Sequence, residues 1–166
     1  MLSMFDATIP TITRMLGNLS AVLKKAQDHA DAKKIDPSVL VAARLFPDMY
    51  PLSRQVQIAT DMSKGAAARL AGVQVPKFED NEITFDDLQE RITKTINFLE
   101  SIKPEQLVGA ETRDISITVG KTALAFTGQQ YLLNWVNPNL YFHITTAYNI
   151  LRHNGVELSK RDYLGN

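Results

Sequence analysis

The chain has 166 residues, with 18 basic and 18 acidic side chains, three histidines and no cysteine. This length predicts one domain over residues 1–166, large enough to bury a core without disulfides. The lack of cysteine excludes disulfides, thiolate nucleophiles and cysteine-ligated zinc. The balanced charge argues against a broad surface for nucleic acid or anionic membrane.

The sequence shows neither a signal peptide nor a membrane span. Residues 1–14 lack the basic start, apolar run and cleavage site of a signal peptide. No apolar stretch approaches the roughly 20 residues that a spanning helix needs. The most apolar run, residues 38–46, is interrupted by Arg44. We therefore expect a cytoplasmic protein that binds neither nucleic acid nor membrane.

Apolar residues at spacings of three and four predict an all-α fold. Four main helices are expected over residues 4–33, 51–71, 85–102 and 139–154. A short helix over residues 37–44 starts at Asp36-Pro37, an Asp cap followed by Pro. The connection over residues 73–83 is long for a helix–helix turn, and it carries the chain either across the end of the bundle or along it.

A small β-hairpin is expected before the last main helix. Residues 113–119 alternate polar and apolar side chains, and residues 122–127 return as a second strand after the turn at Gly120-Lys121. Such a hairpin is marginal alone, so we expect it to pack against the helices. Residues 129–136 predict a short helix, and Asn137-Pro138 restarts the chain before the last helix.

Polar residues on the expected buried faces mark one candidate site. Gln55 falls inside the buried arc of the second main helix. Asn139, His143 and Thr146 share the inward face of the last helix. Burying an imidazole and an amide is unfavourable unless each finds a partner. The stack is therefore either a core histidine that fixes the helix register or a polar pocket for a ligand or metal.

The other polar positions are placed outside this stack. Asp48 joins the side of Gln55 only if the second main helix is extended backward past Pro51. Arg44 either extends to solvent or pairs with a carboxylate, for which Asp48 is the candidate. Several groups are expected to face solvent: His29, Gln57, Asp61, His153 and the acidic loop over residues 77–82.

Three stretches of the sequence resemble a known family, the domain of unknown function 1993 (DUF1993). They are ARLFPDMYPLSRQVQ over residues 43–57, PNLYFHITTAYNILRHNGV over residues 138–156 and NLSAVLKKAQDHA over residues 18–30. The resemblance covers essentially the whole chain. That family is similar to the DinB/YfiT-like metalloenzyme superfamily of four-helix bundles. The resemblance implies a DinB/YfiT-like bundle with a crossed helix order, and a homodimer.

The resemblance also gives an expectation about metal. The wider superfamily holds a divalent ion with three histidines, one on the second helix and an H-x-x-x-H pair on the fourth. Here the pair reads Asn139-x-x-x-His143, and the second-helix position falls near Gln55 or Gln57. Amide oxygens are weak donors for zinc or nickel beside imidazole, so a hydrogen-bonding pocket suits this set better. His143 is the one candidate metal ligand.

Three functions remain open from the sequence. The first is a DinB-like bundle that binds a small molecule between the second and fourth helices, at His143, Asn139, Gln55, Asp48 and Thr146. The second is a divalent-metal-dependent enzyme, a thiol transferase or hydrolase, whose zinc or nickel is held by His143, Asp48 and one other group. The third is a non-catalytic dimeric structural or stress-related protein.

Overall fold

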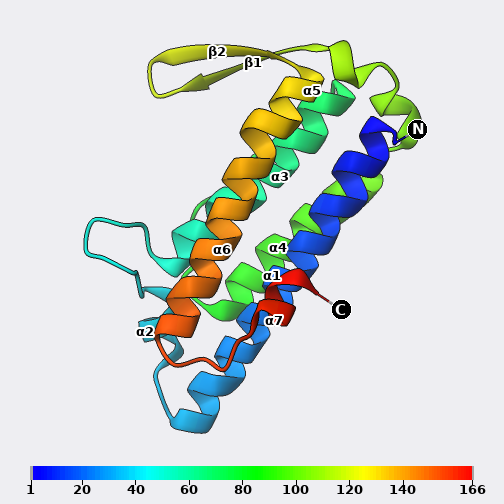
Figure 1. The fold of residues 1–166 in the computed structure, drawn as a ribbon. Helices are drawn as coiled ribbons and strands as arrows, with labels where there is room; N and C mark the ends of the chain where they lie inside the picture. The colour runs from blue at the N-terminus through cyan, green and yellow to red at the C-terminus, as the bar shows by residue number, and fades with distance from the viewer. Residues whose placement is uncertain (1, 166) are drawn as a thin grey trace.

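The structure, a computed structural model, describes residues 2–165; Met1 and Asn166, the ends of the predicted domain, lie outside it. Its helices and strands follow in chain order: α1 (Met4–Lys33), α2 (Pro37–Val41), α3 (Leu52–Ala71), α4 (Phe85–Ser101), η1 (Pro104–Leu107), η2 (Ala110–Thr112), β1 (Asp114–Val119), β2 (Thr122–Thr127), α5 (Gly128–Gln130), η3 (Tyr131–Val136), α6 (Asn137–His153) and α7 (Lys160–Leu164). The predicted helical bundle with a hairpin before the last long helix is confirmed (Figure 1).

The long helices bury the stripes that their periodicity predicts. On α1, apolar residues at spacings of three and four form one buried stripe: Ile9, Ile12, Leu16, Leu19, Leu23, Ala26 and Ala30. On α4, Thr84 and Asp87 form a reciprocal capping box. The short helix α2 ends at Val41 instead of residue 44, because the chain turns there toward the Pro47–Pro51 corner. Within residues 2–165, no helix combines the length and apolar composition needed to cross a bilayer.

Helices α3 and α4 run in the same direction, since the connection over residues 73–83 returns along the bundle (Figure 1). Asp80 bonds Arg54 and Glu82 bonds Gln57, which places the end of this connection beside the beginning of α3. Of the two routes left open by the sequence, the chain therefore takes the one along the bundle. An extended chain advances about 3.3 Å per residue, so a connection of this length can span a long helix.

Helices α3 and α6 are antiparallel neighbours. Gln55, near the beginning of α3, contacts His143 of α6, whereas Arg69, near the end of α3, contacts Tyr131 just before α6. α3 carries many small buried residues, and small residues allow a close approach of helix backbones. They are Ala59, Gly65, Ala66, Ala67 and Ala68.

The predicted break at Asn137-Pro138 is wrong, because the chain continues as helix from α5 through η3 into α6. Pro138 has no backbone N–H, and the preceding segment η3 is π-helical, with wider hydrogen bonds. The N–H of Asn137 bonds the carbonyl of Leu132, five residues back. The side-chain amide of Asn139 donates to the carbonyl of Trp135 at 2.7 Å. With these hydrogen bonds around Pro138, which cannot donate one itself, the helix continues.

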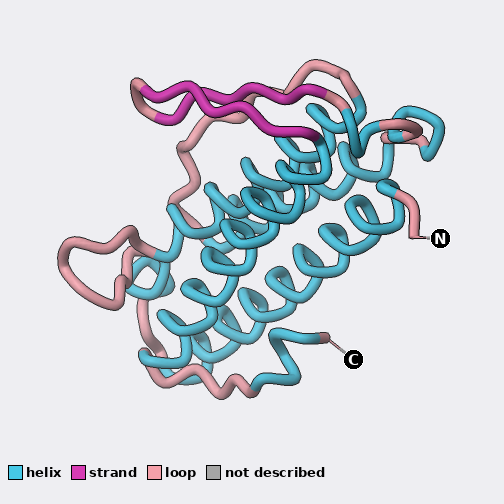
Figure 2. The backbone as a smooth tube through the Cα atoms, turned by 45° about the horizontal axis from the view of Figure 1, so that its top comes forward, coloured by secondary structure: helices cyan, strands magenta, loops and turns pink. Residues whose placement is uncertain are grey.

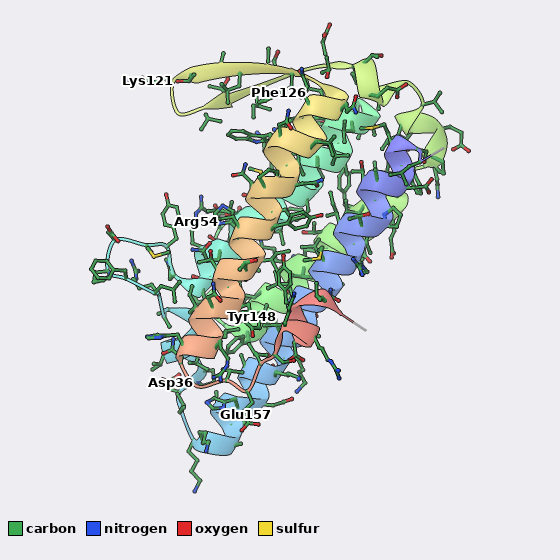
Figure 3. All side chains as sticks on the ribbon, viewed as in Figure 1. Asp36, Arg54, Lys121, Phe126, Tyr148 and Glu157 are labelled. Carbon is green, nitrogen blue, oxygen red and sulfur yellow. The ribbon has the colours of Figure 1, made fainter. Side chains whose placement is uncertain are left out.

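The hairpin lies across one end of the bundle, as the magenta strands of Figure 2 show. Its strands pair with Ile115 opposite Phe126, and Ile115 is buried. The Phe126 ring lies 5.9 Å from the Tyr131 ring and 6.0 Å from the Trp135 ring. Figure 3 shows Phe126 at the bundle end of the hairpin and Lys121 at its tip. The expected packing of the hairpin against helices is confirmed.

Candidate functional site

A hydrogen bond between α3 and α6 forms the centre of the candidate site. His143 Nδ1 lies 2.7 Å from Gln55 Oε1. The Gln55 side chain is 2% exposed, and its Nε2 donates to the backbone carbonyl of Tyr50 at 3.1 Å. Because a carbonyl can only accept, this bond fixes the orientation of the Gln55 amide. Gln55 Oε1 therefore accepts, and His143 Nδ1 carries the proton.

The His143 ring is held neutral with its Nε2 lone pair available. Burial lowers the pKa of the imidazole from its ordinary value of 6.5, and the positive charge of Arg54 lowers this pKa further. Arg54 projects from the beginning of α3 beside α6 (Figure 3). The Phe142 ring stands edge-on to the imidazole, with centroids 5.2 Å apart. A half-buried neutral imidazole of fixed tautomer is a directed hydrogen-bond acceptor.

The other predicted site residues do not join this pair through hydrogen bonds. Asn139 donates to Trp135, and the Thr146 hydroxyl donates to the carbonyl of Phe142 at 2.7 Å, so both bond their own helix. Asp48 is exposed in the loop before α3. Of the two alternatives for Arg44, its side chain is exposed, and within residues 2–165 it forms no ion pair with Asp48.

Arg44 instead donates to two backbone carbonyls of the same loop, those of Pro47 and Met49. The rigid proline corner brings these carbonyls within reach of the guanidinium. His153 is exposed as expected, whereas His29 is half-buried and lines an open cavity with Lys25 and Gly155.

The residues around His143 do not fit a three-ligand metal centre. Gln55 Oε1 is in direct hydrogen-bond contact with His143 Nδ1, so no ion fits between them. In the H-x-x-x-H pair that the resemblance implies for the fourth helix, Asn139 stands at the first position and His143 at the second. Across residues 2–165, no three His, Cys, Asp or Glu side chains are grouped closely enough to hold an ion together. A single imidazole nitrogen is below the ligand count that protein zinc sites use.

A second polar cluster, missed from the sequence, is centred on Arg91 of α4, which is 2% exposed. Its Nε donates to Thr60 Oγ1 at 2.7 Å. Its Nη1 donates to Glu82 Oε1 at 2.8 Å, and its Nη2 to Asp61 Oδ1 at 2.8 Å. Nη2 also lies 3.1 Å from Asp80 Oδ1. The guanidinium thus binds side chains from α3 and from the connection before α4.

This cluster corrects the expectation that several polar groups face solvent. Gln57 is buried, donates to Glu82 Oε2 at 2.8 Å and accepts from Arg54. Asp61 is shared by Arg91 and Lys64, and Glu82 of the acidic connection is half-buried beside Arg91, whereas Glu79, Asp80 and Asn81 are exposed as expected. The position of Arg91 on its helix could have indicated that it is buried. Arg91 falls on the stripe of buried α4 residues, with Leu88, Ile92, Thr95 and Leu99.

This chain is similar to known proteins in both sequence and fold. The profile of the domain of unknown function DUF1993 matches residues 4–164. A crystal structure of a DinB family member protein from Shewanella denitrificans is 43% identical, with 98% of this chain and 92% of that chain covered and a TM-score of 0.89. No curated protein matches the chain. The chain therefore belongs to the DUF1993 family and has a DinB-like fold.

Proposed function

We propose that this DinB-like protein binds a small polar molecule at the His143–Gln55 pair, between α3 and α6, without a metal ion. The supporting observation is the bond from His143 Nδ1 to Gln55 Oε1, 2.7 Å long and itself fixed by Tyr50. It leaves Nε2 as a directed acceptor on a neutral ring. A ligand hydroxyl, amide N–H or protonated carboxyl donates to such an acceptor.

Asn139 extends this binding surface by one helical turn. The side-chain nitrogen of Asn139 donates to the backbone carbonyl of Trp135. Its side-chain oxygen is therefore left to accept a second hydrogen bond from the ligand. Residues four apart lie on the same face of a helix, about 6 Å along its axis. The ligand class is therefore a small molecule whose two hydrogen-bond donors reach two acceptors at about this separation, such as a diol or a primary amide.

Nuclear magnetic resonance of the histidine ring nitrogens tests the proposal. A panel of small diols, primary amides and carboxylic acids is titrated into the wild-type protein, His143→Ala and His153→Ala. We expect at least one compound to shift His143 Nε2, with binding lost in His143→Ala and retained in His153→Ala, the matched variant at an exposed histidine. If no compound shifts the His143 ring, the proposal fails.

The same variants test the metal-dependent enzyme, which the donor set supports less well. Tag-free protein is incubated with zinc, nickel and manganese and its metal content is measured. Stoichiometric metal that disappears in His143→Ala would overturn the metal-free proposal. If His143→Ala lowers stability and no ligand binding is found in the wild type, the histidine is a core residue that fixes helix register.

A further inference from the structure

Residues 74–82, here called the strap, lie on the bundle as an extended segment held by side chains. The side chains of Phe78, Asp80 and Glu82 contact the helices, although Asp80 stays exposed, whereas the side chains of the intervening Glu79 and Asn81 are exposed and make no such contact. This alternation is the period of an extended peptide. None of the strap residues is fully buried. Within residues 2–165, no backbone–backbone hydrogen bond joins the strap to another segment.

The surface beneath the strap, here called the groove, is cationic. The groove is formed by α3 and α4 and is defined by Arg54, Gln57, Lys64 and Arg91. The Phe78 ring lies 4.2 Å from Lys64 Nζ and 5.5 Å from Arg91 Cζ. Asp61 pairs with Lys64 and Arg91, and the strap carboxylates pair with Arg54 and Arg91.

Side-chain chemistry in the groove matches a carboxylate-bearing peptide. Arg91 binds Glu82 Oε1 and Asp80 Oδ1, and it also donates to the backbone carbonyl of Glu79 at 3.0 Å. Gln57 donates to the second oxygen of Glu82. Charge-assisted bonds from guanidinium to carboxylate are among the strong hydrogen bonds of proteins, and arginine also packs on aromatic rings.

The strap does not fill the space above α4. A cavity of about 390 Å³ lies between strap residues, including Phe78 and Glu82, and the α4 residues Glu90, Arg91 and Lys94. Removing the strap would break neither a helix nor a backbone ladder. Segments with few buried contacts and no backbone hydrogen bonds open at low free-energy cost.

We propose that the strap is an internal ligand, and that the groove binds an extended acidic peptide segment of a partner protein. The segment presents an aromatic residue and two carboxylates at alternate positions, in the pattern Phe-x-Asp-x-Glu. Peptides bound in an extended conformation are recognised through such alternate side chains. This site uses other residues than the His143–Gln55 pair, with Arg54 lying beside both, and it goes beyond the function proposed for that pair.

Peptide binding to the full chain tests the proposal. The probe is a fluorescein-labelled peptide with the sequence of residues 74–83, used with wild type, with an Asp80→Asn/Glu82→Gln variant and with Glu79→Gln. The wild-type strap competes at an effective concentration on the order of millimolar, so we expect weak binding. Loss of the strap carboxylates should tighten peptide binding by about tenfold or more. Glu79→Gln, a strap acid without an ion pair, should bind like wild type.

Two further measurements complete the test. A peptide in which the Asp and Glu side chains are replaced by their amides should not bind any of the proteins. Trypsin cleavage after Lys77, which requires an open strap, should be faster in the double variant and unchanged in Glu79→Gln. If the double variant does not fold, the single Asp80→Asn variant should show the same changes, smaller in size. Equal affinity for wild type and variant, or for acidic and amide peptides, would overturn the proposal.

Discussion

At the residue scale, one hydrogen-bond partner, Gln55, sets the tautomer of the His143 ring. Gln55 Oε1 accepts a hydrogen bond from His143 Nδ1. The bond from Gln55 Nε2 to the Tyr50 carbonyl prevents the side-chain amide from flipping. A protonated ring would need a partner for Nε2 as well, in a place where Arg54 already contributes positive charge. The same arrangement that offers Nε2 to a ligand therefore also makes the fold sensitive to mild acid.

We predict that the free energy of unfolding decreases as the pH falls from 7.5 toward 5.5. The pKa of His143 is lowered in the folded state, so below pH 6.5 the unfolded chain binds the proton first and becomes favoured. The loss is complete once the pH is below the folded pKa. Urea unfolding at several pH values checks this. The slope should be reduced in His143→Gln and unchanged in His153→Gln.

Two glycines provide a second test at this scale. A Cβ on Gly128 would lie 1.8 Å from the backbone oxygen of Ala110, whereas a Cβ on Gly17 would meet no atom within 4 Å. Gly128→Ala should therefore lower the free energy of unfolding by about 1–3 kcal/mol or more, because backbone must shift. Gly17→Ala, on the exposed side of α1, should raise it by about 0.5–1 kcal/mol. Thermal and urea unfolding of both variants measure the contrast.

At the scale of elements, Arg91 joins α4 to α3 and to the connection that precedes α4. Its side chain is 1% exposed, and Glu82, its partner, is 8% exposed. Such a pair is sensitive to the loss of one member, because the remaining charge stays in a poorly solvated place.

We predict that Arg91→Ala lowers the free energy of unfolding by about 3–5 kcal/mol, since Glu82 and Asp61 lose their guanidinium partner. Lys94→Ala is the matched change one turn later on α4. Its pair with Glu90 is exposed on both sides, so its loss should cost less than about 1 kcal/mol. Urea unfolding at neutral pH measures both. Similar losses in the two variants would contradict the structural role of Arg91.

The elements that follow from local pattern were predictable from the sequence, and those that depend on distant contacts were not. The apolar stripe of α1, the end of α3 at Gly72, whose φ is 71°, and the alternation of β1 all have local causes. The continuity of α6 depends on the π-helical turn before Pro138, which proline rules do not foresee. In the same way, helical phase identified Gln55 and His143. It could not reveal that Asn139 and Thr146 bond their own helix, or that the connection folds onto Arg91.

At the scale of the whole molecule, the order of the helices separates chain neighbours from spatial neighbours. α3 and α4 follow one another but run parallel, so the antiparallel partner of α3 is α6 (Figure 1). This is the crossed order that the family resemblance implied. It places the candidate site between elements that are far apart in the sequence.

The homodimer expected from that resemblance is a prediction for the whole molecule. Sedimentation velocity over a hundredfold range of concentration should show a dimer that dissociates on dilution. Apolar side chains at the surface, including Phe46, Phe142 and Leu133, are available to such an interface. A monomer at every concentration would contradict the dimer and, with it, the third function considered from the sequence.

The parallel course of α3 and α4 also has a consequence for biosynthesis. α3 ends at Ala71, but its partner α6 begins at Asn137. At about 5–20 residues per second, a ribosome takes several seconds to make the chain between them. During that delay the alanine-rich face of α3 has no partner, so nascent chains should recruit chaperones until α6 emerges. Ribosome-stalled chains that end near residue 110 should bind ribosome-associated chaperones more strongly than chains in which α6 has emerged.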